Sequence, residues 1–268
     1  MIKLIASDMD GTLLNDRKEL PGDFFEVFDE LERRGIKFTV ASGRSFDAVA
    51  HLFPEEYRTR LDFICDNGAN VIHEGKQVSV TPLDRPTFEQ LIRACEDIGG
   101  LRILVCAGRG TYHLTADAEF SAEIAKYYKN HIPCDDLLSV DDVIYKLAVC
   151  DMKGPQQHAK PAIDAIFGDR LNVQVSGPIW MDIMGAGVSK GSALRALGKH
   201  LGISAEDTMA FGDFYNDADM LKYAGWSFAM ENGNPDIKRM TRFLARSNNE
   251  NGVLRAIRKY ALQEDSIK

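Results

Sequence analysis

The stretch Ser7-Asp8-Met9-Asp10-Gly11-Thr12-Leu13-Leu14 places two carboxylates two positions apart at the end of an apolar run, Met1 to Ala6. In an extended chain, residues i and i+2 point to the same side, so Asp8 and Asp10 can direct their oxygens toward one point. Two like charges at one point call for a cation. Gly11 permits a turn that most residues resist, and Thr12 adds a hydroxyl and an amide as donors to an anion. The stretch therefore predicts a site for phosphate and a hard metal ion.

The length and charge of the chain limit the classes of protein to which it can belong. Its 268 residues, 45% of them hydrophobic, suffice for one core domain with a sizeable insertion, so we expect two domains. The formal net charge is −8 and the pI is near 5.3. An acidic chain argues against nucleic acid as a partner, because such binding needs a dense basic face. A soluble metabolic protein is favoured.

The cysteines and the hydropathy pattern favour a cytoplasmic location. The five cysteines are odd in number and show no Cys-x-x-Cys spacing, which supports neither a disulfide framework nor a zinc knuckle. No stretch approaches the roughly 20 apolar residues that a spanning helix requires. The N-terminus enters a strand at once, without a charged leader and an apolar signal core. We expect reduced thiols and no membrane partner.

Strand-like and helix-like segments alternate at both ends of the chain, which is the rhythm of parallel βαβ units. These segments are a strand to Ala6, a helix near 22–34, strands near 36–41 and 62–65, a hairpin over 70–72 and 77–80, then a helix over 189–201, a strand over 208–211, a helix over 217–223 and a strand near 226–229. The fold class predicted is α/β, a doubly wound and mostly parallel sheet.

The middle of the chain has a different order of elements. We expect helices near 87–98, 119–129 and 157–167, strands near 102–106, 111–114 and 144–150, and a hairpin over 171–176 and 180–184. Strands and helices there are mixed and largely antiparallel. The predicted organisation is a discontinuous core domain, residues 1–82 and 185–268, with an inserted α+β cap domain over residues 83–184.

Four loops of the predicted core carry matching chemistry. Ligands of a doubly wound sheet sit beyond the carboxyl ends of its strands, so these loops belong together. They supply Asp8 and Asp10, then Ser42-Gly43-Arg44, then Gly212-Asp213-Phe214-Tyr215-Asn216-Asp217, while Lys190 opens a helix. Oxygens of Asp8, Asp10 and Asp213 suit Mg²⁺. Ser42, Lys190 and Asn216 would then hold phosphate oxygens.

This layout resembles the haloacid dehalogenase-like phosphohydrolase superfamily, in particular its Cof-type branch with a large α+β cap between the second and third motifs. The resemblance covers essentially the whole chain. It rests on ordered matches, namely Asp8-Met9-Asp10-Gly11-Thr12-Leu13-Leu14, Ser42-Gly43-Arg44, Asn67-Gly68-Ala69, Ser189-Lys190-Gly191, Gly212-Asp213-Phe214-Tyr215-Asn216-Asp217 and Ala229-Met230-Glu231-Asn232. Several ordered matches are more specific than any single one.

The resemblance implies a role for each matched residue. Asp8 would be the nucleophile, and Asp10 the general acid and later the base, binding the metal through its main-chain carbonyl. Lys190 would offset charge on the phosphoryl group, and Asp217 would be an outer residue that orients Lys190 or a metal-bound water. The full predicted site is catalytic Asp8, Asp10 and Lys190, substrate-binding Thr12, Ser42, Gly43, Lys190 and Asn216, and metal-binding Asp8, Asp10 and Asp213.

One segment departs from the family pattern, and one matched residue has a local interpretation. Asn232-Gly233-Asn234 occupies the place where relatives usually carry Asn-Ala, which would loosen the turn into the next helix without touching a catalytic role. Asn67 lies in a glycine-containing turn, and we interpret its side chain as a partner of local backbone rather than a site residue. The cap shows no pattern that identifies a substrate.

The function predicted is a Mg²⁺-dependent phosphatase of a small phosphorylated metabolite, such as a sugar phosphate or a cofactor-precursor phosphate, acting through an aspartyl-phosphate. Two alternatives stay open. A sugar phosphomutase would use the same phosphoaspartate and need an activating bisphosphate. A non-catalytic phosphate-binding module would combine an acidic Mg²⁺ pocket with a phosphoacceptor aspartate, although Asp10 disfavours it because an acid/base shortens the life of the acyl phosphate. We expect a monomer or a weak homo-oligomer.

Overall fold

Strand β1 (Leu4–Ser7) is wholly buried and is parallel to both of its neighbours, β12 (Thr208–Gly212) and β2 (Lys37–Ala41). The computed structural model describes residues 1–115, 120, 124, 128 and 130–264. In this part of the chain the strands form two sheets, and the chain divides into two compact units. The first unit comprises Met1–Gly43, Leu52–Ser79 and Ser189–Lys268, and the second Arg44–His51 and Val80–Val188.

The sheet of the first unit has β1 at its centre. Its strand order is β14-β13-β12-β1-β2-β3-β4-β5, with β3 (Asp62–Cys65), β4 (Asn70–His73), β5 (Lys76–Val80), β13 (Trp226–Met230) and β14 (Phe243–Ala245). The strands from β14 to β3 run parallel, and β4 is antiparallel to β3. The carboxyl ends of parallel strands lie on the same side of a sheet, which we call the carboxyl edge. The loops that follow β1, β2 and β12 therefore lie together at this edge.

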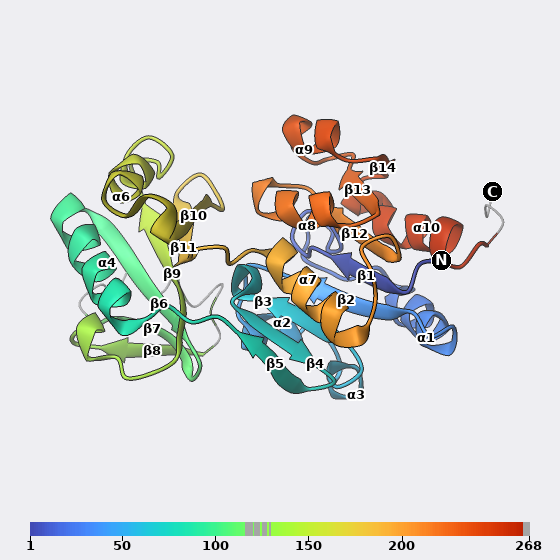
Figure 1. The fold of residues 1–268 in the computed structure, drawn as a ribbon, viewed down its shortest axis with the longest axis horizontal. Helices are drawn as coiled ribbons and strands as arrows, with labels where there is room; N and C mark the ends of the chain where they lie inside the picture. Colours follow the sequence, from blue (N-terminus) through green and yellow to red (C-terminus); the bar gives the residue numbers. More distant parts are fainter. Residues whose placement is uncertain (116–119, 121–123, 125–127, 129, 265–268) are drawn as a thin grey trace. The chain divides into compact units, whose positions relative to one another are not determined.

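Helices cover both faces of this sheet (Figure 1). They are α1 (Phe24–Arg33), α3 (Glu55–Arg58), α7 (Lys190–Leu201), α8 (Ala218–Tyr223), α9 (Pro235–Met240) and α10 (Gly252–Ala256), which continues as a π-helical turn over Ile257–Ala261. On one face, Leu194 of α7 and Met220 of α8 join a core cluster with Leu4 of β1. On the other, the ring of Phe24 in α1 meets Phe38 of β2 edge to face, at a centroid distance of 5.5 Å.

The second unit has a mixed sheet with the strand order β10-β11-β9-β6-β7-β8. Its strands are β6 (Leu101–Ala107), β7 (Gly110–Leu114), β8 (His131–Cys134), β9 (Ile144–Asp151), β10 (Leu171–Val175) and β11 (Trp180–Gly185), and its helices are α2 (Phe46–Ala50), α4 (Arg85–Ile98) and α6 (Ala159–Phe167). Among the described residues, β7 pairs with β8 in parallel and the other pairings of this sheet are antiparallel. Apolar residues of α4 and α6 bury one face of this sheet.

The predicted fold class is confirmed, since a mostly parallel sheet lies between helices and is accompanied by a separate α+β unit. The division into a core (1–82 and 185–268) and a cap (83–184) stays a prediction of functional domains. The observed units differ from it in three segments, because Arg44–His51 and the flanking residues 80–82 and 185–188 group with the second unit.

Two strands were missed in the sequence prediction, for different reasons. β8 contains Pro133 and is an edge strand, where proline is tolerated because it donates no ladder hydrogen bond. β14 is three residues long and lies at the other sheet's edge, too short to show alternation. The helix predicted near 119–129 lies largely outside the described residues.

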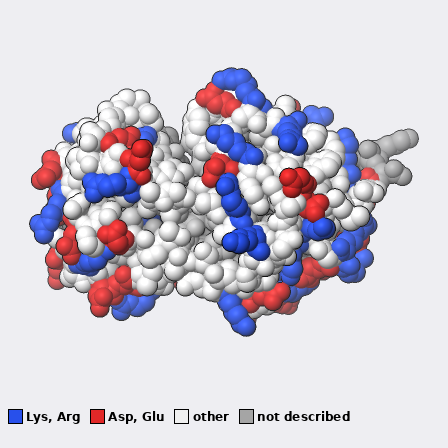
Figure 2. Space-filling model, in the orientation of Figure 1, with Lys and Arg blue, Asp and Glu red and all other residues white. Residues whose placement is uncertain are grey.

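No helix among the described residues is long and apolar enough to cross a membrane. On the face drawn in Figure 2, basic and acidic side chains are interspersed rather than gathered by sign.

Asp62 is the first residue of β3, and its carboxylate is buried. It lies at the opposite end of β3 from the loop that follows this strand. Its Oδ1 lies 2.7 Å from His73 Nδ1, whereas Oδ2 is buried and accepts no hydrogen bond from the described residues. Burial raises the pKa of Asp62 above its ordinary value, and the contact with His73 opposes this only in part.

A raised folded-state pKa makes the ionised Asp62 a destabilising group. The folded state then holds the proton more tightly than the unfolded chain, so stability falls as pH rises from the unfolded pKa through the folded one. We expect Asp62→Asn, which cannot ionise, to raise the melting temperature relative to wild type by a few degrees at pH 8 and by less at pH 4.5. Thermal unfolding of both proteins at the two pH values measures this.

The exposed Asp97→Asn in α4 is the matched control and should leave the difference between the two pH values unchanged. An Asp62→Asn effect that is equal at pH 4.5 and pH 8 would contradict the account.

Candidate active site

The register of the parallel strands brings the first three predicted loops to one edge. Ser7 pairs with both Phe211 of β12 and Val40 of β2, so Asp8, Asp213 and Ser42 follow strands that end side by side. Asp8 continues the ladder, its amide donating to the Phe211 carbonyl at 3.1 Å. The Ser42 amide likewise donates to the Ile64 carbonyl of β3 at 2.8 Å. The backbone at the start of the loops after β1 and β2 is therefore held by a neighbouring strand.

Lys190 is the fourth predicted element and is fully buried. It is the first residue of α7, whose preceding Ser189 caps the helix by accepting a hydrogen bond from the Ser192 amide. Its ammonium donates to Asp8 Oδ1 at 2.6 Å and to Asp217 Oδ1 at 2.7 Å. A buried cation needs such partners, because an unpaired charge in the interior is strongly destabilising.

Asp217 is buried and uses both of its carboxylate oxygens within the protein. Oδ1 accepts from Lys190, and Oδ2 accepts from the amides of Asp213 at 2.9 Å and Phe214 at 3.2 Å. Asp217 thereby shapes the loop that carries Asp213 and at the same time holds the Lys190 ammonium. These contacts are those of a residue that orients its neighbours.

Carboxylates gather where a metal ion was predicted. One oxygen from each of Asp8, Asp213 and Asp217 lies within 4.8 Å of the others. The Asp10 side chain is outside this group. Since both Asp217 oxygens are already engaged, Asp8 and Asp213 are the side chains best placed to be ligands.

The clustering of charge changes the acidity of each group. Burial, with repulsion from Asp217 and Asp213, raises the pKa of Asp8 well above its ordinary value despite the nearby Lys190. Burial and repulsion from Asp217 likewise raise the pKa of Asp213 to about 7. Burial alone would lower the pKa of Lys190, but attraction to Asp217 and Asp8 outweighs it and the pKa is raised. The site thus holds more negative charge than one lysine neutralises.

This excess of carboxylate oxygen fits a hard divalent cation. Mg²⁺ takes oxygen ligands and is commonly held by one or two carboxylates together with waters. A cation bound to Asp8 and Asp213 would counter the repulsion that, together with burial, raises their pKa values. The residues present therefore suit the metal that the sequence predicts.

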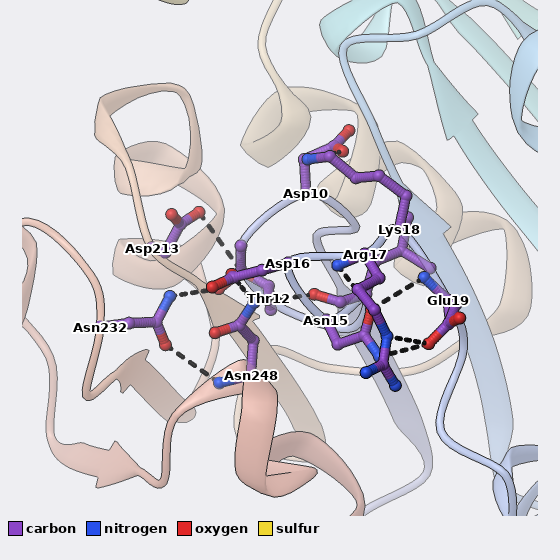
Figure 3. Close-up of polar contacts among 12 residues, drawn as sticks. Asp10, Thr12, Asn15, Asp16, Arg17, Lys18, Glu19, Asp213, Asn232 and Asn248 are labelled. Atoms are coloured by element: carbon purple, nitrogen blue, oxygen red, sulfur yellow. Dashed lines mark hydrogen bonds and ion pairs between the residues drawn. The ribbon is translucent and has the colours of Figure 1, made fainter.

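The turn after Asp10 is packed tightly against Asp213. Gly11 has φ +82°, and a Cβ at this position would lie 2.5 Å from Asp213 Oδ2, so any larger residue would collide with the carboxylate. The Thr12 hydroxyl donates to Asp213 Oδ1 at 3.3 Å (Figure 3). Thr12 was predicted to be a phosphate donor, whereas its hydroxyl here orients a predicted metal ligand.

Asp10 has a partner that the sequence analysis missed. Lys18 Nζ lies 2.8 Å from Asp10 Oδ1, and Figure 3 shows its side chain reaching back over the loop to this carboxylate. Lys18 has φ +64°, a left-handed conformation that is uncommon for a lysine. The Asp10 side chain remains 36% exposed. No spacing rule identifies such a contact, because it depends on the path of the intervening loop.

Two asparagines from the end of the chain support the same loop (Figure 3). Asn232 donates from Nδ2 to the Gly11 carbonyl at 2.7 Å and accepts from the Asn248 amide at 3.0 Å. Asn248 in turn donates to the Leu14 carbonyl at 3.0 Å. Asn232 was part of the quoted resemblance without a role, and its contacts show that it braces the turn between Asp10 and Thr12.

The remaining predicted residues, Ser42, Gly43 and Asn216, are linked through Asn67. Asn216 Nδ2 donates to Asn67 Oδ1 at 3.2 Å, and the Asn67 amide donates to the Ser42 carbonyl at 3.1 Å. The edge therefore carries a cationic and carboxylate centre around Asp8 together with hydroxyl and amide donors, a combination suited to binding and attacking a phosphoryl group.

A family model for haloacid dehalogenase-like hydrolases matches residues 5–257. The chain belongs to this family. The predicted resemblance is thereby confirmed, as is the predicted enzyme class, a hydrolase of a family whose relatives include named phosphatases.

Haloacid dehalogenase-like relatives match over nearly full length. The 5-amino-6-(5-phospho-D-ribitylamino)uracil phosphatase YbjI of Escherichia coli (strain K12) is 32% identical, over 98% of this chain and 97% of that protein. The HMP-PP phosphatase of Klebsiella pneumoniae (strain 342) is 28% identical, over 89% and 87%. The crystal structure of SMU.1108c from Streptococcus mutans UA159 is 28% identical and superimposes with a TM-score of 0.91, over 98% of this chain and 100% of that one.

Proposed function

We propose that this protein is a Mg²⁺-dependent phosphatase that hydrolyses a phosphate monoester of a small metabolite through an aspartyl-phosphate on Asp8. The observation that carries the proposal is the buried Lys190 ammonium, shared between Asp8 and Asp217 at 2.6 and 2.7 Å, with Asp213 beside them. A buried carboxylate held by a lysine at an open sheet edge is arranged to meet an anionic phosphoryl group.

Binding a phosphate dianion beside Asp8 requires positive charge and hydrogen-bond donors. Lys190 supplies a fixed charge, and the Ser42 hydroxyl, the Gly43 amide and the Asn216 carboxamide supply donors. Mg²⁺ held by Asp8, Asp213 and the Asp10 carbonyl would add charge that draws the phosphate to Asp8 and offsets its negative charge. Positioning and electrostatics of this kind account for most of the catalysis in phosphoryl transfer.

The chemical steps assign one task to each carboxyl group. A carboxylate oxygen of Asp8 forms a bond to phosphorus while the ester P–O bond breaks, and the departing alkoxide takes the proton of the Asp10 carboxyl group. Asp10, now ionised, accepts a proton from water as the water oxygen attacks phosphorus. The bond between phosphorus and Asp8 breaks, which releases inorganic phosphate and restores both residues. Partial exposure of Asp10 leaves it accessible to the leaving group and to water.

The proposed substrate class draws on the relatives. Their names specify a phosphorylated ribitylaminouracil and HMP-PP, two small phosphorylated molecules. We extend that class to this chain, namely a sugar phosphate or a cofactor-precursor phosphate, without choosing one compound, since a shared fold and site determine the reaction more than the substrate.

Asp8→Asn tests the nucleophile. We expect it to lower phosphate release by at least about 10³-fold, because an amide oxygen is a poor nucleophile and removal of a nucleophile is among the largest single losses known. The measurement is phosphate release from a panel of sugar phosphates, cofactor-precursor phosphates and an aryl phosphate, with Mg²⁺ and with EDTA. Chelation should abolish wild-type release, and added Mg²⁺ should restore it.

Asp97→Asn is the control, since Asp97 is an exposed aspartate of α4 outside the predicted site and should keep most of the wild-type rate. Undiminished release by Asp8→Asn, or release that is indifferent to EDTA, would contradict the proposal.

Asp10→Asn tests the general acid. The loss should be large for alkyl phosphates, about 10²–10⁴-fold, and much smaller for an aryl phosphate whose leaving group needs no proton. The ratio of kcat/KM values for the two ester types is the measurement. An equal loss on both types would show that proton donation is not what Asp10 contributes to the first step.

A further inference from the structure

Asn67 lies in a strained loop at the carboxyl end of β3. Asp66, Asn67 and Gly68 have φ values of +51°, +53° and +104°, three successive residues in a region that side chains disfavour. Asp66 and Asn67 are also completely buried. Asparagine and aspartate tolerate this conformation better than most residues, but it still costs free energy and is maintained only where surrounding structure imposes it. Such strain is concentrated at functional sites.

The Asn67 side chain does not act within its own turn alone. Its Oδ1 accepts a hydrogen bond from Asn216 Nδ2, a residue 149 positions later in the chain, at 3.2 Å. The glycine-containing turn predicts a side chain that bonds local backbone. The structure shows that this side chain also bonds a residue of the loop after β12.

Asn67 also contacts the loop after β2. Its amide donates to the Ser42 carbonyl at 3.1 Å. A Cβ on Gly43 would lie 3.1 Å from Asn67 Oδ1, so the carboxamide rests directly against the Gly43 backbone. Ser42, Gly43 and Asn216 are the three residues proposed to donate hydrogen bonds to phosphate, and Asn67 touches all of them.

The next residue packs against the start of α7. A Cβ on Gly68 would lie 2.2 Å from the Ser189 carbonyl, so only glycine permits this approach to the residue before Lys190. The loop after β3 therefore packs against the loops after β2 and β12 and against the helix that carries Lys190. This packing explains how an unfavourable backbone conformation is maintained.

We propose that Asn67 is a positioning residue that holds the phosphate donors in place, an inference that rests on the proposed function. By accepting one N–H of the Asn216 carboxamide, it restricts the rotation of that group and leaves the second N–H for a phosphate oxygen. By packing against Ser42 and Gly43, it holds their donors toward the same point. Donors fixed before binding cost less entropy when phosphate arrives.

The test removes the carboxamide and keeps the backbone conformation. Asn67→Gly tolerates a φ near +53°, and Asn251→Gly is a matched control, since Asn251 is an asparagine at φ +55° whose backbone bonds join it to Asn248 and Arg255 rather than to a predicted site residue. Calorimetry with inorganic phosphate and Mg²⁺ should show about tenfold weaker binding for Asn67→Gly, the loss expected for one well-placed donor, and wild-type binding for Asn251→Gly. KM should rise in parallel.

A double-mutant cycle separates positioning from general loosening. If Asn67 acts through Asn216, then Asn67→Gly should weaken phosphate binding far less in an Asn216→Ala background than in wild type. A purely structural role predicts equal losses in both backgrounds. Should Asn67→Gly fail to fold, Asn67→Ser shortens the side chain without adding backbone freedom and carries the same expectation.

The outcomes distinguish this inference from the proposed function. Wild-type phosphate affinity in Asn67→Gly, or equal losses in both backgrounds, would overturn the role of Asn67 while an active wild type leaves the phosphatase intact. A wild type that releases no phosphate from any ester overturns the proposed function. The role of Asn67 is then tested separately by comparing the affinities of wild type and Asn67→Gly for inorganic phosphate. A wild type that also binds no phosphate overturns both.

Discussion

The rest of the first unit depends on one interaction. This is the pairing of the buried Lys190 ammonium with the carboxylates of Asp8 and Asp217. Moving three charges out of water is expensive, and the cost is recovered only when the geometry is good and the remaining hydrogen-bonding positions are filled. Here one Asp217 oxygen accepts from the lysine and the other from two backbone amides. Loss of Lys190 would leave two buried carboxylates without a compensating charge.

That requirement explains why distant segments of the chain must meet at one edge. Asp8 follows the central strand, Lys190 begins a helix, and Asp217 follows a neighbouring strand. The parallel register brings the strand ends together, and the packing of α7 and α8 on a common cluster with β1 brings the lysine to them. Around this centre, Asn232 and Asn67 brace the loops that carry the other polar groups. The apolar packing of these elements thus offsets the free-energy cost of burying the charged groups.

Residues whose position follows from the local chain were predictable from the sequence. Asp8 and Asp10 follow a buried strand, and Lys190 follows a helix cap, so alternation and capping place them. Contacts that depend on the path of a loop were not predictable. Lys18 reaches Asp10 only because its loop folds back, and Asn67 meets Asn216 only because two loops converge. The short edge strands β8 and β14 were missed because proline and brevity hide their pattern.

The central claim is that Asp8 forms a covalent bond to phosphorus, and chemical trapping tests it most directly. Acid quench during turnover preserves an acyl phosphate, and borohydride then reduces it to the alcohol, converting the modified aspartate into homoserine. Peptide mass spectrometry locates the change. The account predicts homoserine at position 8, dependent on substrate and on Mg²⁺. Homoserine at another aspartate, or none during active turnover, would contradict it.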